Sequence, residues 1–117
     1  MKRIFSATLN SLRGLRYGFR REAALREELI LLAAGLILAL FVAPTVAWYV
    51  AMIGVLLVLL GIEFLNTAIE KLADRLTTDH DLQIGRVKDM GSAAVGVTTL
   101  MAAGFWLFAL VERMGAI

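Results

Sequence analysis

Four polar residues recur at helical spacing between Glu63 and Asp74. Glu63, Asn66, Glu70 and Asp74 stand at positions i, i+3, i+7 and i+11, so we expect them to share one helix face. With a rise of about 1.5 Å per residue, Glu63 and Glu70 lie about 10 Å apart along the axis. Glu63 ends a run without charged side chains, over residues 29–62. A carboxylate at such a boundary is costly and indicates a functional site.

The elements that position this face are predicted to be membrane helices. The mean hydropathy of the chain is +0.79 and 60% of its 117 residues are hydrophobic. The run 29–62 is too long for one crossing of a bilayer, and Pro44 divides it. The sequence therefore predicts helices over 28–43, 45–74 and 89–112, with Trp48, Tyr49 and Trp106 as interfacial aromatics.

Residues 1–21 follow a different pattern. Apolar residues such as Phe5, Leu9 and Leu12 share one side of a helix, and basic residues such as Arg13 and Arg20 lie on the other. This pattern is typical of a helix that lies on an anionic membrane surface. The alternative is a solvent-facing helix on a soluble core, but the sequence offers no such core.

Charge predicts the orientation. Seven of the twelve Lys and Arg residues precede Leu29, and four fall between Lys71 and Lys88. The positive-inside rule places the N-terminus and the 75–88 loop in the cytoplasm and the C-terminus outside. The chain is then expected to be a multi-pass membrane protein.

This orientation gathers nine of the ten acidic residues near the cytoplasmic interface. Carboxylate oxygens favour Mg²⁺, which commonly arrives with nucleotide phosphates. The alternative is a belt of charged side chains reaching the membrane surface, and it has most weight for Glu27, Glu28, Asp79 and Asp81. The absence of cysteine and the single histidine, His80, argue against thiolate or histidine-rich metal sites.

The stretch from Gly85 to Ser92 supplies a second potential site. Asp89 with Ser92 is interpreted as the N-cap of the last helix, where free backbone N–H groups and Lys88 would hold a phosphate. The common nucleotide-binding and kinase motifs are missing from the sequence. A bound nucleotide would therefore need an uncommon fold.

Three stretches together resemble the prokaryotic integral-membrane diacylglycerol kinase family. They are Glu22–Glu28, Glu63–Asp74 and the Gly85–Val95 segment, and the resemblance covers nearly the whole chain. It implies an all-α membrane protein with a surface helix and three transmembrane helices per protomer, forming one kinase domain. It also implies a homotrimer with active sites shared between protomers, and transfer of the ATP γ-phosphoryl group to diacylglycerol, giving phosphatidic acid.

The resemblance also implies roles for individual residues. Glu63 resembles the general base, with Asn66 beside it, and Glu22 and Glu70 resemble the carboxylates that hold Mg²⁺–ATP. Further positions expected to contact the nucleotide are Arg3, Asn10, Asp79, Asp81, Lys88 and Asp89. Those expected to contact the lipid are Arg3, Ala24, Glu27, Glu28, Glu63, Ser92 and Trp106.

This sequence departs from the family pattern at a few of these positions. Glu27 stands where Gln is more frequent, and Asn10 where an aromatic is frequent. The segment Asp79-His80-Asp81 also differs. Two alternatives stay open: a kinase for undecaprenol or another lipid alcohol, and a small oligomeric transporter that uses Glu63. The clustering of Glu22, Glu70, Lys88 and Asp89 at one face favours the kinase. The role of Asp74, chemical or structural, is open too.

Overall fold

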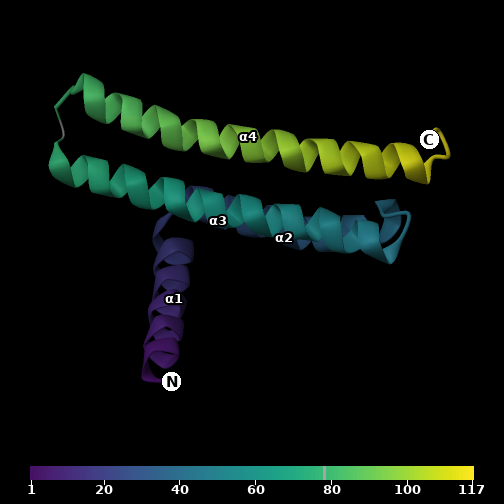
Figure 1. Ribbon diagram of the computed structural model, residues 1–117, viewed down its shortest axis with the longest axis horizontal. Coiled ribbons are helices and arrows are strands. Elements are labelled where there is room, and N and C mark those ends of the chain that lie inside the picture. The colour runs from purple at the N-terminus through teal and green to yellow at the C-terminus, as the bar shows by residue number, and fades with distance from the viewer. Residues whose placement is uncertain (78) are drawn as a thin grey trace.

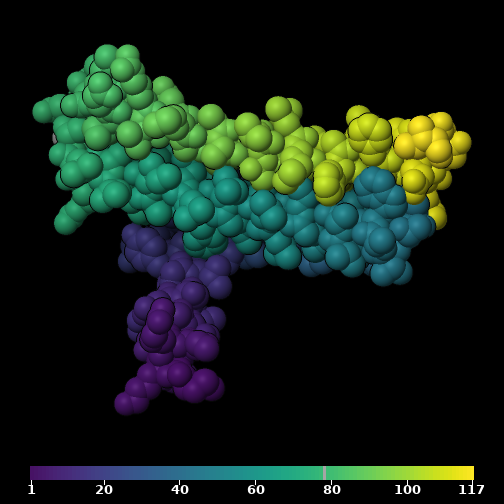
Figure 2. All heavy atoms as spheres, viewed as in Figure 1, coloured from purple at the N-terminus to yellow at the C-terminus, as the bar shows by residue number. Residues whose placement is uncertain are grey.

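The computed structural model describes residues 1–77 and 79–117. Over these residues the chain forms four helices: α1 (Lys2–Arg21), α2 (Ala23–Val42), α3 (Val46–Leu76) and α4 (Leu82–Arg113). The helices α2, α3 and α4 lie side by side, and α1 is directed crosswise to them (Figure 1). The space-filling view shows α1 standing clear of the packed bundle (Figure 2).

A single residue separates α1 from α2. Glu22 has an extended backbone, with φ −115° and ψ 116°, and its N–H donates to the carbonyl of Gly18. Arg26 reinforces the end of α1 by donating its guanidinium to the carbonyls of Phe19 and Arg20. Such side-chain donors satisfy carbonyls that a helix end leaves free. The crosswise direction of α1 is therefore set at Glu22.

The turn between α2 and α3 lies at Pro44, where the sequence predicts it. Helix α2 ends at Val42, and Thr45 caps α3 by accepting a hydrogen bond from the backbone N–H of Trp48 at 3.1 Å. Proline cannot continue the first helix, and threonine is a favourable N-cap for the next. The two helices accordingly form an antiparallel hairpin.

The start of α4 corrects a prediction. Asp81, not Asp89, is the N-cap, and its carboxylate accepts from the backbone N–H of Ile84 at 3.0 Å. The helix therefore begins at Leu82, and the predicted phosphate site at a helix N-terminus near Asp89 and Ser92 is wrong. Backbone N–H groups there are bonded within the helix. The predicted 75–88 loop is also shorter, because residues 82–88 are helical.

The core of the protomer is thin and made largely of small or slender side chains. One cluster joins Ala39 of α2, Met52 of α3 and Ala109 of α4, and a second joins Val55, Leu56 and Ala102. Alanine at such positions lets helix backbones approach closely, as is typical of membrane bundles. Most large apolar side chains on α2 and α4 are exposed.

In the part of the chain that the structure describes, two helices are long and apolar enough to cross a membrane, α3 with 31 residues and α4 with 32. Only 22% and 17% of their most apolar windows are buried in the protomer, so they are not core helices of a soluble domain. Helix α2 carries Arg26, Glu27 and Glu28 near its start, which shortens its apolar length. Both α3 and α4, at about 1.5 Å per residue, exceed the bilayer core and project beyond it.

Candidate active site

The acidic face of α3, formed by Glu63, Asn66, Glu70 and Asp74, becomes more exposed towards the end of the helix. Glu63 and Asn66 are half-buried, whereas Glu70 and Asp74 are exposed. The amide of Asn66 donates to Glu70 Oε1 over a long 3.4 Å, so it links the two carboxylate positions only weakly. The predicted helical face is thus formed, with polarity increasing from Glu63 towards the α3–α4 connection.

Asn66 packs against a glycine of the neighbouring helix. Gly91 of α4 is buried, and a Cβ built there would overlap Asn66 Oδ1. That oxygen is buried and has no hydrogen-bond partner among the described residues. Buried polar atoms are usually paired, so an unpaired one beside a carboxylate indicates a site for an incoming donor. Gly91 therefore makes room for the polar side chain of Asn66.

Negative charge accumulates around Glu63. Electrostatic repulsion acts between Glu63 and Glu28 of α2, and between Glu63 and Glu70. Within residues 1–77 and 79–117, however, no three acidic or histidine side chains are arranged as ligands of one metal ion. The arrangement attracts cations, and a bound cation would relieve the repulsion.

Asp74 is paired across the bundle. Its carboxylate lies 2.5 Å from Nζ of Lys88 on α4. The pair joins the projecting ends of α3 and α4 on either side of the connection between them. In this structure Asp74 holds the two helix ends together, and Lys88 lies on the same side of the bundle as Glu70.

Glu22, a predicted metal ligand, is also paired. Its carboxylate lies 2.5 Å from Nζ of Lys71 on α3. The same ammonium group lies 5.5 Å from the centre of the Tyr17 ring of α1. In this structure the Glu22 carboxylate is therefore paired with a cation, and within residues 1–77 and 79–117 Glu22 and Glu70 belong to no group of three metal-binding side chains.

Several predicted residues lie away from Glu63 within one protomer. Arg3 is near the N-terminal end of α1, which is directed away from the bundle (Figure 1). Asn10, on the same helix, accepts a hydrogen bond from Arg13. Asp81 is occupied as a helix cap, and Asp79 is exposed beside it. The remaining predicted positions, Ala24 and Glu27 on α2 and Asp89 and Ser92 on α4, are exposed.

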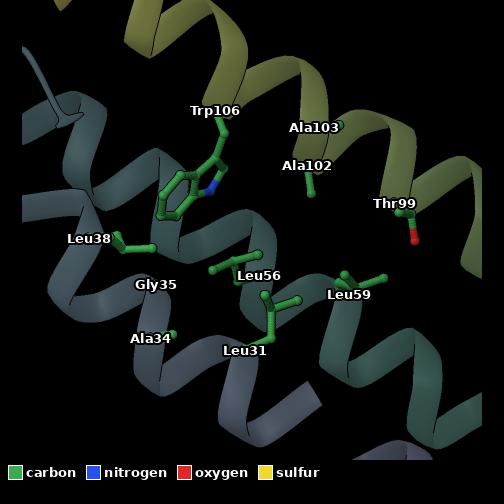
Figure 3. Close-up of a pocket in the computed structure, with 10 residues that line it drawn as sticks. All are labelled: Leu31, Ala34, Gly35, Leu38, Leu56, Leu59, Thr99, Ala102, Ala103 and Trp106. Carbon is green, nitrogen blue, oxygen red and sulfur yellow. The ribbon is translucent and has the colours of Figure 1, made fainter. Parts of the chain in front are cut away.

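Trp106 is half-buried and faces the inside of the bundle, and its predicted place at the membrane interface stays a prediction. Its indole N–H donates to the carbonyl of Met52 at 3.2 Å. The ring closes one end of an apolar groove of about 310 Å³ between α2, α3 and α4, with Gly35 and Leu56 among its neighbours (Figure 3). Apart from Thr99, the residues that line this groove are apolar.

Sequence reasoning missed two residues of this region, Lys71 and Tyr17. Lys71 stands next to Glu70 in the sequence but one helical step around the axis, towards α1. Its partners come from α1 and from the α1–α2 junction, so only the direction of α1 reveals the pairing. No sequence pattern within α3 could have found it.

These features define a helical protein with membrane-spanning helices and an acidic site at one end of its bundle. The family model for prokaryotic diacylglycerol kinase matches residues 9–110. The diacylglycerol kinase of Escherichia coli (strain K12) is 33% identical over 113 residues, covering 97% of this chain and 93% of that protein. The diacylglycerol kinase of Pseudomonas aeruginosa is 36% identical over 106 residues, covering 91% and 86%. The chain belongs to the prokaryotic diacylglycerol kinase family, which confirms the resemblance seen in the sequence.

Proposed function

We propose that this protein is an ATP-dependent lipid kinase, a single membrane-embedded domain that phosphorylates the primary hydroxyl of diacylglycerol. The products are phosphatidic acid and ADP. Family membership supports this reaction, and so do the relatives, which are named as diacylglycerol kinases. The observation that carries it on this chain is the acidic face of α3, which runs from half-buried Glu63 to exposed Glu70.

Glu63 is proposed as the general base. It lies at the inner end of the acidic face, where a lipid hydroxyl can arrive from the bilayer, and it accepts the hydroxyl proton. The lipid oxygen then bonds to the γ-phosphorus of ATP, and the bond from that phosphorus to the β–γ bridging oxygen breaks. ADP leaves with the negative charge. Asn66, whose buried Oδ1 has no hydrogen-bond partner among the described residues, is proposed to orient groups beside Glu63.

Magnesium fits the donor chemistry of this region. Glu22 and Glu70 supply the carboxylate oxygens that Mg²⁺ prefers, and the repulsion around Glu63 favours a bound cation. When bound with ATP, the ion would neutralise charge on the transferring phosphoryl group. Glu70 is exposed and can reach an aqueous nucleotide, whereas Glu22 first has to leave Lys71.

The other assignments follow the family resemblance. Lys88 and Asp89 on α4 are proposed to contact the phosphates and the nucleotide. The wider nucleotide contacts are Arg3, Asn10, Asp79 and Asp81. The lipid contacts are Arg3, Ala24, Glu27, Glu28, Ser92 and Trp106. Because Trp106 borders the apolar groove, it is proposed to act on the acyl part of the substrate and not on its hydroxyl.

The assembly in the membrane is proposed to be a homotrimer with shared active sites. The exposed apolar faces of α2 and α4 support contacts with lipid or with other copies. Helix α2 is proposed as the third transmembrane helix. The basic residues of α1 support an inner-membrane location with the N-terminus and the α3–α4 connection in the cytoplasm and the C-terminus outside.

The nearest alternative is an undecaprenol kinase of the same fold. Diacylglycerol and undecaprenol both present a primary hydroxyl, so the site residues do not distinguish them. The relatives are named as diacylglycerol kinases, which favours diacylglycerol as the acceptor. A transporter using Glu63 would not need the paired residues Glu22, Lys71, Asp74 and Lys88 at one end of the bundle.

The test offers both lipids to the purified protein in mixed micelles with Mg²⁺ and γ-labelled ATP. We expect label to enter phosphatidic acid, with little transfer to undecaprenol. Preferential labelling of undecaprenol would show that undecaprenol, and not diacylglycerol, is the acceptor. The absence of transfer to any lipid would argue for the transporter.

A further inference from the structure

Lys71 makes two contacts that the catalytic scheme does not use. Its ammonium group is 2.5 Å from the Glu22 carboxylate and 5.5 Å from the centre of the Tyr17 ring. Together with Phe64 and Leu25, these residues line a pocket of about 250 Å³ where α1, α2 and α3 meet. Lys71 thus joins the spanning helix α3 to the junction that sets the direction of α1.

The surroundings hold Glu22 where Lys71 can reach it. The backbone of Glu22 is fixed by the hydrogen bond from its N–H to Gly18 and by one from Arg26 to its carbonyl. Gly18 is buried against Phe64, and Phe64 stacks edge-to-face on Phe19 with ring centres 5.3 Å apart. The side chain of Glu22 is only 25% exposed. The carboxylate is therefore the shielded partner of the ion pair, whereas the Lys71 side chain is 47% exposed and can move.

An ammonium group and a divalent metal ion cannot use this carboxylate in the same way. Mg²⁺ binds carboxylate oxygen at about 2.0–2.1 Å and demands near-ideal octahedral geometry. The ammonium of Lys71 already occupies Glu22 Oε1 at hydrogen-bond distance, and its charge repels a cation. Lys71 and a metal ion at Glu22 would therefore compete for the negative charge of one carboxylate.

We propose that Lys71 is an internal counter-ion that competes with the divalent metal for Glu22. The proposal rests on the proposed function, in which Glu22 is a metal ligand. In the metal-free protein, Lys71 neutralises Glu22 and ties α1 to α3. When the metal binds, Lys71 is displaced, which keeps metal affinity lower than the carboxylates alone would give. Lys71 is accordingly a positioning residue and not a catalytic one.

The experiment measures binding of Mn²⁺ alone, by its electron paramagnetic resonance signal, to the full chain in lipid nanodiscs without nucleotide. The variants are Lys71→Met, Lys71→Arg and Glu22→Gln, with Arg75→Met as the matched control. Arg75 is an exposed cation on the same helix, one turn further along. Circular dichroism verifies that each variant keeps its helices.

We expect Lys71→Met to lower the Kd for Mn²⁺ about threefold to tenfold, because a nearby positive charge and a competing partner are removed. Lys71→Arg should keep the wild-type Kd within a factor of about two, since it preserves both charge and pairing. Arg75→Met should leave the Kd unchanged.

The outcomes separate this inference from the function on which it rests. If Glu22→Gln weakens Mn²⁺ binding while Lys71→Met leaves it unchanged or weaker, competition by Lys71 is refuted and the metal role of Glu22 stands. If Glu22→Gln leaves Mn²⁺ binding at the wild-type value, the metal role of Glu22 fails. If Arg75→Met raises Mn²⁺ affinity as much as Lys71→Met does, the gain comes from removing any nearby positive charge. This result would also overturn the proposal.

Discussion

At the scale of single residues, the most informative atom is Asn66 Oδ1. It is buried beside Glu63 on α3, and Gly91 of α4 is the surface against which it rests. Leaving such an oxygen unpaired costs about 1–3 kcal/mol, which an incoming hydrogen-bond donor would recover. The helical spacing predicted that Asn66 shares a face with Glu63. It could not predict Gly91 as the neighbour, because that contact depends on the register of α4 against α3.

Gly91→Ala tests this contact. The added methyl group would overlap Asn66 Oδ1, so we expect a loss of about 1–3 kcal/mol of stability and a clear drop in kcat as Asn66 is displaced. Thermal unfolding in detergent and the lipid kinase assay measure the two effects. Gly96→Ala on the same helix is the control, because a methyl group there meets open space. Equal behaviour of the two variants would remove Gly91 from the site.

Glu70→Gln tests the nucleotide end of the acidic face. We expect the affinity for Mg²⁺–ATP to fall about tenfold or more, since a charged ligand oxygen is replaced by a neutral amide. Isothermal titration with a non-hydrolysable ATP analogue and Mg²⁺ gives the Kd. Glu112→Gln serves as the control, because Glu112 lies near the C-terminal end of α4, far along that helix from its connection to α3. An unchanged Kd for Glu70→Gln would refute its metal role.

At the scale of elements, the helix starts show what the sequence can specify. Pro44 and Thr45 mark the α2–α3 turn through local chemistry, and the turn is where the sequence predicts it. The cap of α4 was predicted at Asp89 from local sequence alone. The structure uses Asp81, which lengthens α4 by about two turns and brings Lys88 level with Asp74. The start of α4 depends on packing against α3, which no local pattern contains.

Asp81→Ala should therefore destabilise the protein by about 1 kcal/mol through loss of the cap. Asp81→Asn keeps a capping oxygen and should retain nearly wild-type stability. Thermal unfolding of both variants in the same detergent separates the cap from the charge. Equal destabilisation by Ala and Asn would show that the negative charge, and not the cap, matters. A lower nucleotide affinity in Asp81→Asn would in turn support its proposed nucleotide contact.

At the scale of the whole molecule, one protomer does not bring all the proposed site residues together. Helix α1, which carries Arg3 near its N-terminal end, is directed away from the bundle of α2, α3 and α4 (Figure 1). The sequence predicted α1 as a surface helix from its apolar and basic faces, and its apolar residues Phe5, Leu9 and Leu12 are indeed exposed. Its direction, set at Glu22, was not predictable from those faces. If Arg3 contacts substrate, it reaches a site in a neighbouring copy.

Mixing two inactive variants tests this sharing. Arg3→Ala and Glu63→Gln chains are each expected to lose activity in homogeneous assemblies. When they are unfolded, mixed in equal amounts and refolded together into micelles, activity should return in part, because some sites combine an intact Arg3 with an intact Glu63. Assemblies mixed without unfolding are the control. Failure to regain activity in the refolded mixture would contradict shared sites.

The most direct measurement of the central claim compares wild-type protein with Glu63→Gln. Both are given diacylglycerol and Mg²⁺ with γ-labelled ATP, and nucleotide affinity is measured separately. We predict that the variant transfers phosphoryl about 100- to 10,000-fold more slowly, because the general base is lost, while its affinity for the nucleotide changes little. Near-normal transfer to diacylglycerol by Glu63→Gln would contradict the assignment of Glu63 as the base.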